Sequence, residues 1–300
     1  MKLDSLHILL TYTCNYECDH CFVWGSPRLP GVFTLEGITQ VLHQAHDTGT
    51  IREIYFEGGE AFLYYPLLLE SIRWATALGF STGVVTNGYW ATTEDDARLW
   101  LAPLLEAGLD AVDVSIDDFH AGGQLTNPGE AVQNAAQALG MASSTITITH
   151  SGDSRDPTLW RAGLPLTGGD VMFRGRAAEM LVGGLPRQPW SAFPTCPYEN
   201  LETPHRLHLD PLGNLHICQG LVIGNLFKRP LIQILEEFDP RQRPPIDTLI
   251  AGGPSLLIER YLQDRQTGFV DACHACYTAR LSLRERFPEV LIPDQMYGLL

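Results

Sequence analysis

The chain has no long hydrophobic run and little positive charge. None of its 300 residues lies in an uninterrupted apolar stretch near membrane-span length, and the start, MKLDSLHILL, has too short an apolar run for a signal peptide. Lys and Arg number 20 against 35 Asp and Glu, giving a formal net charge of -15. Nucleic acids and anionic membranes select basic surfaces, so both are poor partners for this chain. We expect a cytoplasmic protein.

Cysteine is present in an odd number, seven, without a secretion signal. A disulfide framework is therefore a poor expectation, and metal binding or catalysis is the better one. The segment TYTCNYECDHCF carries Cys14, Cys18 and Cys21 with the spacing C-x3-C-x2-C. The other four are Cys196, Cys218, Cys273 and Cys276.

Three cysteines in one short segment leave a metal site incomplete. A closed zinc site or a fully ligated iron-sulfur cluster takes four protein ligands, so three leave one position open. A zinc site completed by His20 is the alternative, as are reduced cysteines without a ligand. Zinc motifs usually pair C-x2-C with a second distant pair, which fits the triplet less well.

Short apolar runs alternate with helical patterns over the first 175 residues, which predicts an α/β fold with a parallel sheet. The expected strands begin at Leu6, Glu53, Thr82, Ala111, Thr145 and Asp170. The expected helices cover residues 35–48, 65–79, 93–107 and 129–140. In such a sheet ligands bind at the carboxyl ends of the strands, where the triplet follows the first strand.

The pattern changes beyond Pro194. RLHLDPLGNLHICQG predicts a hairpin, PLIQILEEF a helix, and RQRPPID and AGGP predict loops. Cys273 and Cys276 form a C-x2-C at an expected helix start. We expect two domains, at 1–193 and 194–300.

The triplet after the first strand resembles the hallmark of the radical S-adenosylmethionine (SAM) enzymes. The resemblance implies a partial (β/α)6 barrel in which three thiolates hold a 4Fe-4S cluster and the open iron binds SAM. Electron transfer from the cluster then cleaves SAM to methionine and a 5'-deoxyadenosyl radical.

A second motif supports the resemblance. FEGGEA, with Gly58, Gly59 and Glu60, resembles the family segment that contacts the SAM amino group, although Ala61 replaces the usual proline. Glycines allow backbone to come close to a ligand.

Further SAM contacts follow from the same resemblance. It makes Asn87, Ser115 and Asp117 candidates at the ends of the third and fourth strands, with the two on the fourth strand facing the ribose. His20 takes the place of an aromatic residue that packs on adenine in the family. A helix cap or turn is the alternative for Asp117, and an exposed loop position is the alternative for His20.

Candidates for the substrate chemistry are fewer. Arg174 and Arg176 share one alternating face of the expected sixth strand, so a guanidinium there could bind a carboxylate of SAM or substrate. A structural ion pair is the alternative. His120 and His150 follow expected strands and could transfer protons, although a strand-end histidine is more often a polar loop residue.

The second module resembles the twitch and SPASM auxiliary-cluster domains, because Cys196 is followed by a hairpin segment, GNLHIC. Four thiolates can close one 4Fe-4S cluster, which favours a small α+β twitch-like domain, and a four-cysteine zinc site is the alternative.

The resemblance implies a radical SAM enzyme with two clusters. It would abstract hydrogen from a small-molecule or peptide substrate, use an external one-electron reductant, and act like an oxidoreductase with net oxidation. A metabolite is the preferred substrate, since the first strand begins near Leu6 and leaves no room for a fused peptide-recognition domain. The alternatives are a SPASM-type peptide maturase, a non-catalytic iron-sulfur carrier or scaffold, and a zinc-stabilised interaction protein.

Overall fold

The computed structural model describes residues 1–120, 127–148, 171–263 and 268–299. Within them lies an eight-stranded mixed sheet with the order β5-β4-β3-β2-β1-β6-β7-β8. The strands are β1 (Ser5–Leu9), β2 (Glu53–Glu57), β3 (Ser81–Thr86), β4 (Ala111–Ser115), β5 (Ala142–Ile146), β6 (Arg206–Leu209), β7 (Asn214–Cys218) and β8 (Leu221–Asn225). No helix in the described ranges combines the length and apolar character that crossing a bilayer requires.

Six neighbouring strands, from β5 to β6 in the sheet order, run parallel. Their carboxyl ends therefore lie along one edge, where ligands of parallel sheets bind. β7 and β8 continue the sheet as an antiparallel pair beyond β6.

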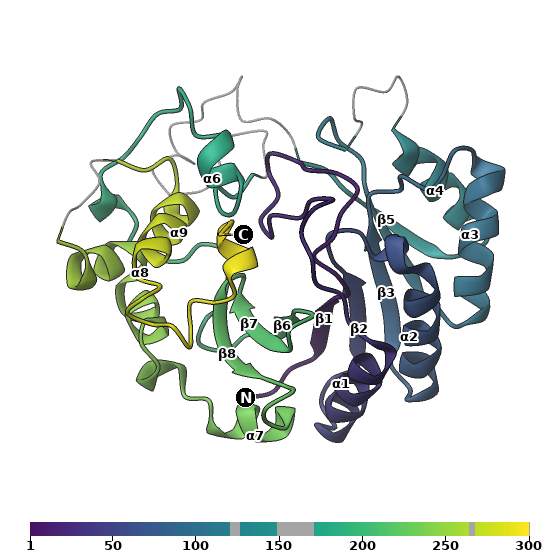
Figure 1. Ribbon diagram of the computed structural model, residues 1–300, viewed down its shortest axis with the longest axis horizontal. Coiled ribbons are helices and arrows are strands. Elements are labelled where there is room, and N and C mark those ends of the chain that lie inside the picture. The colour runs from purple at the N-terminus through teal and green to yellow at the C-terminus, as the bar shows by residue number, and fades with distance from the viewer. Residues whose placement is uncertain (121–126, 149–170, 264–267, 300) are drawn as a thin grey trace.

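Four helices connect the parallel strands from β1 to β5: α1 (Leu35–Asp47), α2 (Tyr65–Ala77), α3 (Glu94–Glu106) and α4 (Pro128–Ala138). Figure 1 shows them along one side of the strands. The side chains of Thr34 and Thr93 accept hydrogen bonds from the first turns of α1 and α3, which explains where these helices begin. All four helices expected from the sequence are confirmed.

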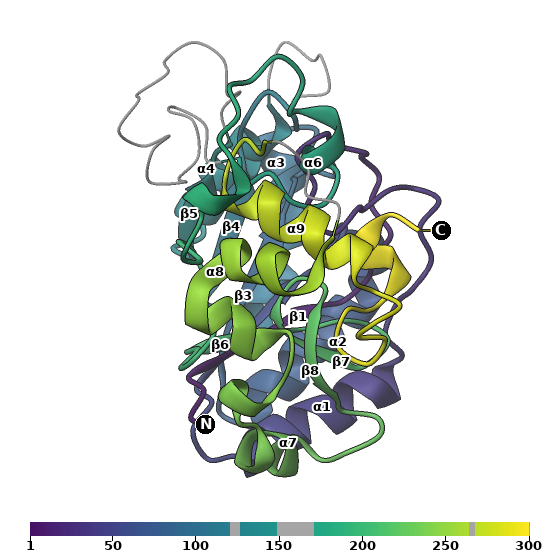
Figure 2. The same cartoon turned by 90° about the vertical axis from the view of Figure 1, so that its left-hand side faces the viewer.

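Further α-helices in the described residues are α6 (Ala177–Met180), α7 (Leu231–Glu237), α8 (Ile246–Tyr261) and α9 (Ala272–Ser282). Figure 2 shows α8 and α9 in front of the strands, on the side away from α3. The expected AGGP loop coincides with a kink in α8, where Gly252 and Gly253 have non-helical φ/ψ and separate two helical stretches. The helix expected over PLIQILEEF, residues 230–238, and the hairpin of β6 and β7 are confirmed.

The strand expected from Asp170 is wrong over the residues that the structure describes. Residues 171–176 form no strand, and Gly175 has a φ of +60°, a left-handed conformation that ends an extended segment. Val171 and Phe173 are buried in a small cluster of their own. The position beside β1 belongs instead to β6.

Two further expectations concern boundaries. The fifth strand begins three residues before the expected Thr145, and His150 lies outside the described residues.

The ladder between β1 and β6 joins the two halves of the chain into one sheet. The division at 193/194 stays a prediction.

Candidate functional site

The cysteine triplet lies on the loop that leaves the carboxyl end of β1. The amide of Tyr16 donates to the Cys14 sulfur at 3.4 Å, and the amide of Gly25 donates to the Cys21 sulfur at 3.2 Å. Burial raises the pKa of all three thiols, that of Cys18 to about 12. Thiolates at this place therefore need a positively charged group such as iron, and the amides directed at sulfur suit cluster ligands.

Gly58 and Gly59 attach this loop to the end of β2. Gly59 donates its amide to the Thr11 carbonyl at 2.7 Å, and the next amide, of Glu60, donates to the Thr13 carbonyl at 3.0 Å. A Cβ at Gly58 would lie 2.7 Å from the Thr11 oxygen, and one at Gly59 would collide with the Thr13 carbonyl. The glycines thus bring backbone close to the backbone of the triplet loop.

Arg176 supports the other side of the loop. Its Nη1 donates to the Cys18 carbonyl at 2.7 Å, and its Nη2 donates to the carbonyls of Trp24 and Gly25 at 2.9 Å each. The side chain is buried and lies over the Trp24 ring. These contacts make Arg176 a positioning residue for the triplet.

Replacing Arg176 by alanine is expected to lower the free energy of unfolding by about 3 kcal/mol or more, because buried carbonyls lose their donors. The iron content after reconstitution is expected to fall as well. Arg28→Ala is the matched control, since Arg28 pairs with Glu17 on the surface and its side chain is 76% exposed. Thermal unfolding and iron per chain measure both effects, and equal iron in the two variants would contradict the positioning role.

Glu60 connects the ends of β2 and β3. One carboxylate oxygen accepts from the Phe62 amide at 3.0 Å and the Thr86 hydroxyl at 2.9 Å, and the other accepts from the Asn87 amide at 2.8 Å. Burial raises the pKa of Glu60 to about 7. The side chain thereby fixes the backbone beside the triplet.

Asn87 reaches from the end of β3 to the triplet loop. Its side-chain amide donates to Asn15 Oδ1 at 3.0 Å and lies 3.8 Å from the Cys14 sulfur. The structure therefore brings Asn87 beside the first cysteine, and its contact with the cofactor stays a prediction.

The segment after β4 brings Asp117, His120 and His20 together. Asp117 Oδ1 lies 2.7 Å from His120 Nδ1, and its Oδ2 accepts from the Ile148 amide at 3.1 Å. Burial acts to raise the pKa of Asp117, but the hydrogen bond and charge of His120 outweigh it and lower the pKa. The His20 ring lies 5.1 Å from the His120 ring, and Ser115 is buried at the end of β4.

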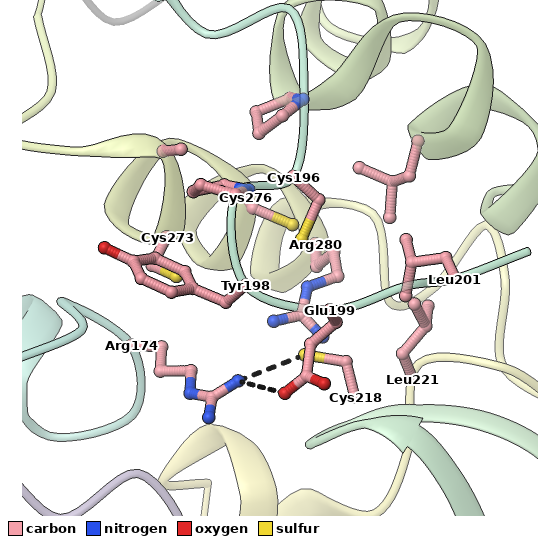
Figure 3. A pocket seen from close by; sticks show the side chains of 14 residues that line it. Arg174, Cys196, Tyr198, Glu199, Leu201, Cys218, Leu221, Cys273, Cys276 and Arg280 are labelled. Carbon is pink, nitrogen blue, oxygen red and sulfur yellow. Dashed lines mark hydrogen bonds and ion pairs between the residues drawn. The ribbon is translucent and has the colours of Figure 1, made fainter. Parts of the chain in front are cut away.

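The other four cysteines line one cavity. Figure 3 shows Cys196, Cys218, Cys273 and Cys276 around it, with Arg174 and Arg280 among the neighbouring side chains. Cys218 ends β7, and the two last cysteines lie at the start of α9 as the sequence predicts. Chain segments far apart in the sequence thus bring all four thiols together.

Two buried guanidinium groups border this cavity. Arg174 Nη1 lies 3.3 Å from the Cys218 sulfur and 3.7 Å from Glu199 Oε1. Arg280 is 2% exposed and donates to the Gln219 carbonyl at 2.8 Å, and no described carboxylate lies within 4.0 Å of it. A buried charge needs a partner, so the cavity suits an anionic group such as a cluster with four thiolates.

The expected shared face of Arg174 and Arg176 is wrong. Because Gly175 turns the backbone between them, Arg174 contacts the second cysteine group and Arg176 contacts the triplet loop. Arg174 also lies 5.2 Å from the centre of the Phe22 ring, next to Cys21. Residues 174–176 therefore connect the two cysteine groups.

The sulfur spacing bears on the choice between zinc and a cluster. A single tetrahedral zinc ion bound at about 2.3 Å holds its sulfurs about 3.8 Å apart. Among the described residues, no three cysteine sulfurs all lie within 4.8 Å of one another. Neither cysteine group of the described residues therefore has three sulfurs at the spacing of a single zinc ion.

The sequence analysis missed Arg280 and the structural use of Arg176. Arg280 follows Cys276 by one helical turn, so the i, i+4 spacing on a helix that opens with C-x2-C was the available signal. No local pattern indicates Arg176, because its partners are about 150 residues away.

Comparison with known proteins adds relatives that match part of the chain. A putative peptide biosynthesis protein of Bacillus subtilis is 27% identical over 121 residues, 40% of this chain and 38% of that protein. The GTP 3',8-cyclase of Psychromonas ingrahamii is 29% identical over 125 residues, 40% of this chain and 34% of that enzyme. The chain thus matches little more than a third of the length of these relatives.

Among solved structures, BtrN in complex with AdoMet and 2-DOIA aligns with a TM-score of 0.48 at 17% identity, covering 78% of this chain and 83% of BtrN. The family model described as the Radical SAM superfamily matches residues 8–151. This range contains the triplet, Glu60, Asn87 and the segment after β4. Residues 8–151 of this chain are therefore similar to the Radical SAM superfamily.

Proposed function

We propose that the chain is a radical SAM enzyme that abstracts hydrogen from its substrate by means of a 5'-deoxyadenosyl radical. The observation that carries the proposal is the cysteine triplet at the carboxyl end of β1, inside the matched domain. Three cysteines leave one iron of a 4Fe-4S cluster open, and that iron supplies SAM with the electron that cleaves it.

The residues around the triplet would have two separate roles, to ligate the cluster and to hold the loop that carries its ligands. Cys14, Cys18 and Cys21 would ligate the cluster, and Arg176 and Gly59 would fix the loop that carries them. The role of Arg176 and Gly59 in holding the loop follows from their hydrogen bonds to backbone carbonyls on both sides of it.

The proposed SAM contacts remain those of the sequence analysis. Asn87, which lies beside Cys14, and His20 and Asp117, which lie beside His120, would contact a ligand on the open iron. Glu60 and the two glycines before it would shape that pocket through the backbone, since the carboxylate oxygens of Glu60 already accept from protein groups.

A second 4Fe-4S cluster would occupy the cavity lined by Cys196, Cys218, Cys273 and Cys276. Two observations support a cluster over a zinc ion: no three of the described cysteine sulfurs lie within 4.8 Å of one another, and the guanidiniums of Arg174 and Arg280 are buried beside the cavity. Four thiolates leave no iron open, so this cluster would transfer electrons and would not bind substrate. The proposal that the second half of the chain is a twitch-like auxiliary-cluster domain depends on these four cysteines.

The proposed reaction is a net oxidation. Removal of a hydrogen atom leaves a substrate radical, and loss of one more electron and a proton completes a two-electron oxidation. The second cluster would accept that electron, and an external one-electron donor would reduce the first cluster for each SAM cleavage.

The substrate is proposed as a small metabolite, with a peptide as the second candidate. The similarity to GTP 3',8-cyclases favours a metabolite, and the similarity to a putative peptide biosynthesis protein favours a peptide. Each rests on about 40% of the chain.

Anaerobically reconstituted protein incubated with SAM and a strong reductant tests the function. We expect 5'-deoxyadenosine to accumulate and to increase when the substrate is supplied, as measured by chromatography and mass spectrometry. A protein with a full complement of iron that releases none, with metabolite and peptide pools present, would instead act as an iron-sulfur carrier.

A further inference from the structure

Three metal-binding side chains meet on neighbouring strands, away from both cysteine groups. His7 on β1 and His208 on β6 are directly opposite each other in the parallel ladder. Glu57 on β2 lies two residues beyond Tyr55, the partner of His7. Because side chains two residues apart on a strand share a face, the two imidazoles and the carboxylate project from the same face of the sheet.

The geometry of these groups matches a small coordination site. One ring nitrogen of each histidine and one Glu57 oxygen all lie within 4.8 Å of one another. His7 Nδ1 contacts Glu57 Oε1, and His208 Nε2 lies 3.9 Å from Glu57 Oε2. Among the described residues, no other set of three His, Cys, Asp or Glu side chains meets this criterion.

The types of side chain suit a cation. Divalent transition metals take imidazole nitrogens and carboxylate oxygens as ligands, the imidazole in its neutral form and the carboxylate in its ionised form.

The surroundings hold the ligands in place and leave a way in. The His7 ring stacks on Tyr55 at 5.1 Å, and Tyr55 lies over Gly83 of the next strand, where any Cβ would collide with the ring. The side chains of His7, Glu57 and His208 keep 13%, 16% and 9% of their surface exposed. Rigid strands thus fix the ligands, and solvent reaches them.

We propose that His7, Glu57 and His208 bind one divalent transition-metal ion, of the class of Zn²⁺ or Fe²⁺. Two imidazoles and one carboxylate are the ligand set of open zinc sites and of non-haem Fe(II) sites, in which further positions stay free for water or substrate. The site uses none of the cysteines, so it stands apart from the proposed function.

A zinc titration of the holoprotein tests the site. Full-length protein with its clusters reconstituted is equilibrated with Zn²⁺ and desalted, and zinc, iron and sulfide are measured per chain. We expect about one zinc per chain in the wild type, lowered at least about fivefold in Glu57→Gln and in His208→Gln at unchanged iron. His205→Gln is the matched control, because His205 is exposed and pairs with Asp4 outside the site.

Two results would overturn the assignment. The first is wild-type protein without bound zinc, which would leave His7, Glu57 and His208 as a hydrogen-bonded group only. The second is zinc K-edge absorption of the wild type with sulfur in the coordination shell, which would place the ion at cysteine. The absorption measurement needs no variant, so a folding defect in a variant does not affect it, and neither result alters 5'-deoxyadenosine formation.

Discussion

Protein in which Cys14, Cys18 and Cys21 are all replaced by alanine is expected to form no detectable 5'-deoxyadenosine from SAM. Without these thiolates the open-iron cluster has no ligands, and the electron needed to cleave SAM has no donor within the domain. Iron per chain is expected to fall from about eight to about four, since the second cysteine group keeps its ligands.

The variant is expected to stay folded, because the loop loses two amide-to-sulfur hydrogen bonds but keeps its contacts with backbone carbonyls. Gly59 and Arg176 hold the loop backbone from two sides through hydrogen bonds that alanine at the cysteine positions leaves intact. Iron, sulfide and the 5'-deoxyadenosine released under a strong reductant are measured together with the thermal midpoint. Reductive cleavage of SAM by the folded variant would refute the role given to the triplet.

Local sequence patterns were sufficient for the elements that carry the triplet. Apolar runs and threonine caps place β1 to β4 and α1 to α4, because each depends on residues within one or two turns of chain. The C-x3-C-x2-C spacing is local as well. The position of the first cysteine group was therefore predictable at the end of β1.

Contacts between distant segments were not predictable in this way. Period-two alternation extended a strand through Gly175, whose left-handed conformation separates Arg174 from Arg176. The pairing of β6 with β1 and the meeting of His7 with His208 both depend on strand order, which no single segment encodes. The same limit applies to Arg280. Its position beside the four cysteines was not predictable, because these cysteines come from three separate regions of the chain.

Replacing Cys273 and Cys276 together by alanine is expected to separate SAM cleavage from substrate oxidation. Both residues lie at the start of α9, where alanine suits the helix and the capping hydrogen bond from the His274 amide to the Asp271 side chain remains. Two thiolates cannot hold the cluster, so iron per chain is expected to fall from about eight to about four. 5'-Deoxyadenosine formation is expected to persist, because the triplet is untouched.

The oxidised product is the quantity that this variant is expected to lose. The substrate radical would no longer have an electron acceptor nearby. It would instead regain a hydrogen atom, or an electron and a proton, and revert to substrate. Ser282→Ala, at the exposed end of α9, is the control that keeps iron and product at wild-type levels. Loss of one zinc with iron unchanged at about four would instead identify a structural zinc site, in which case Arg280 would neutralise thiolates held by zinc and not a cluster.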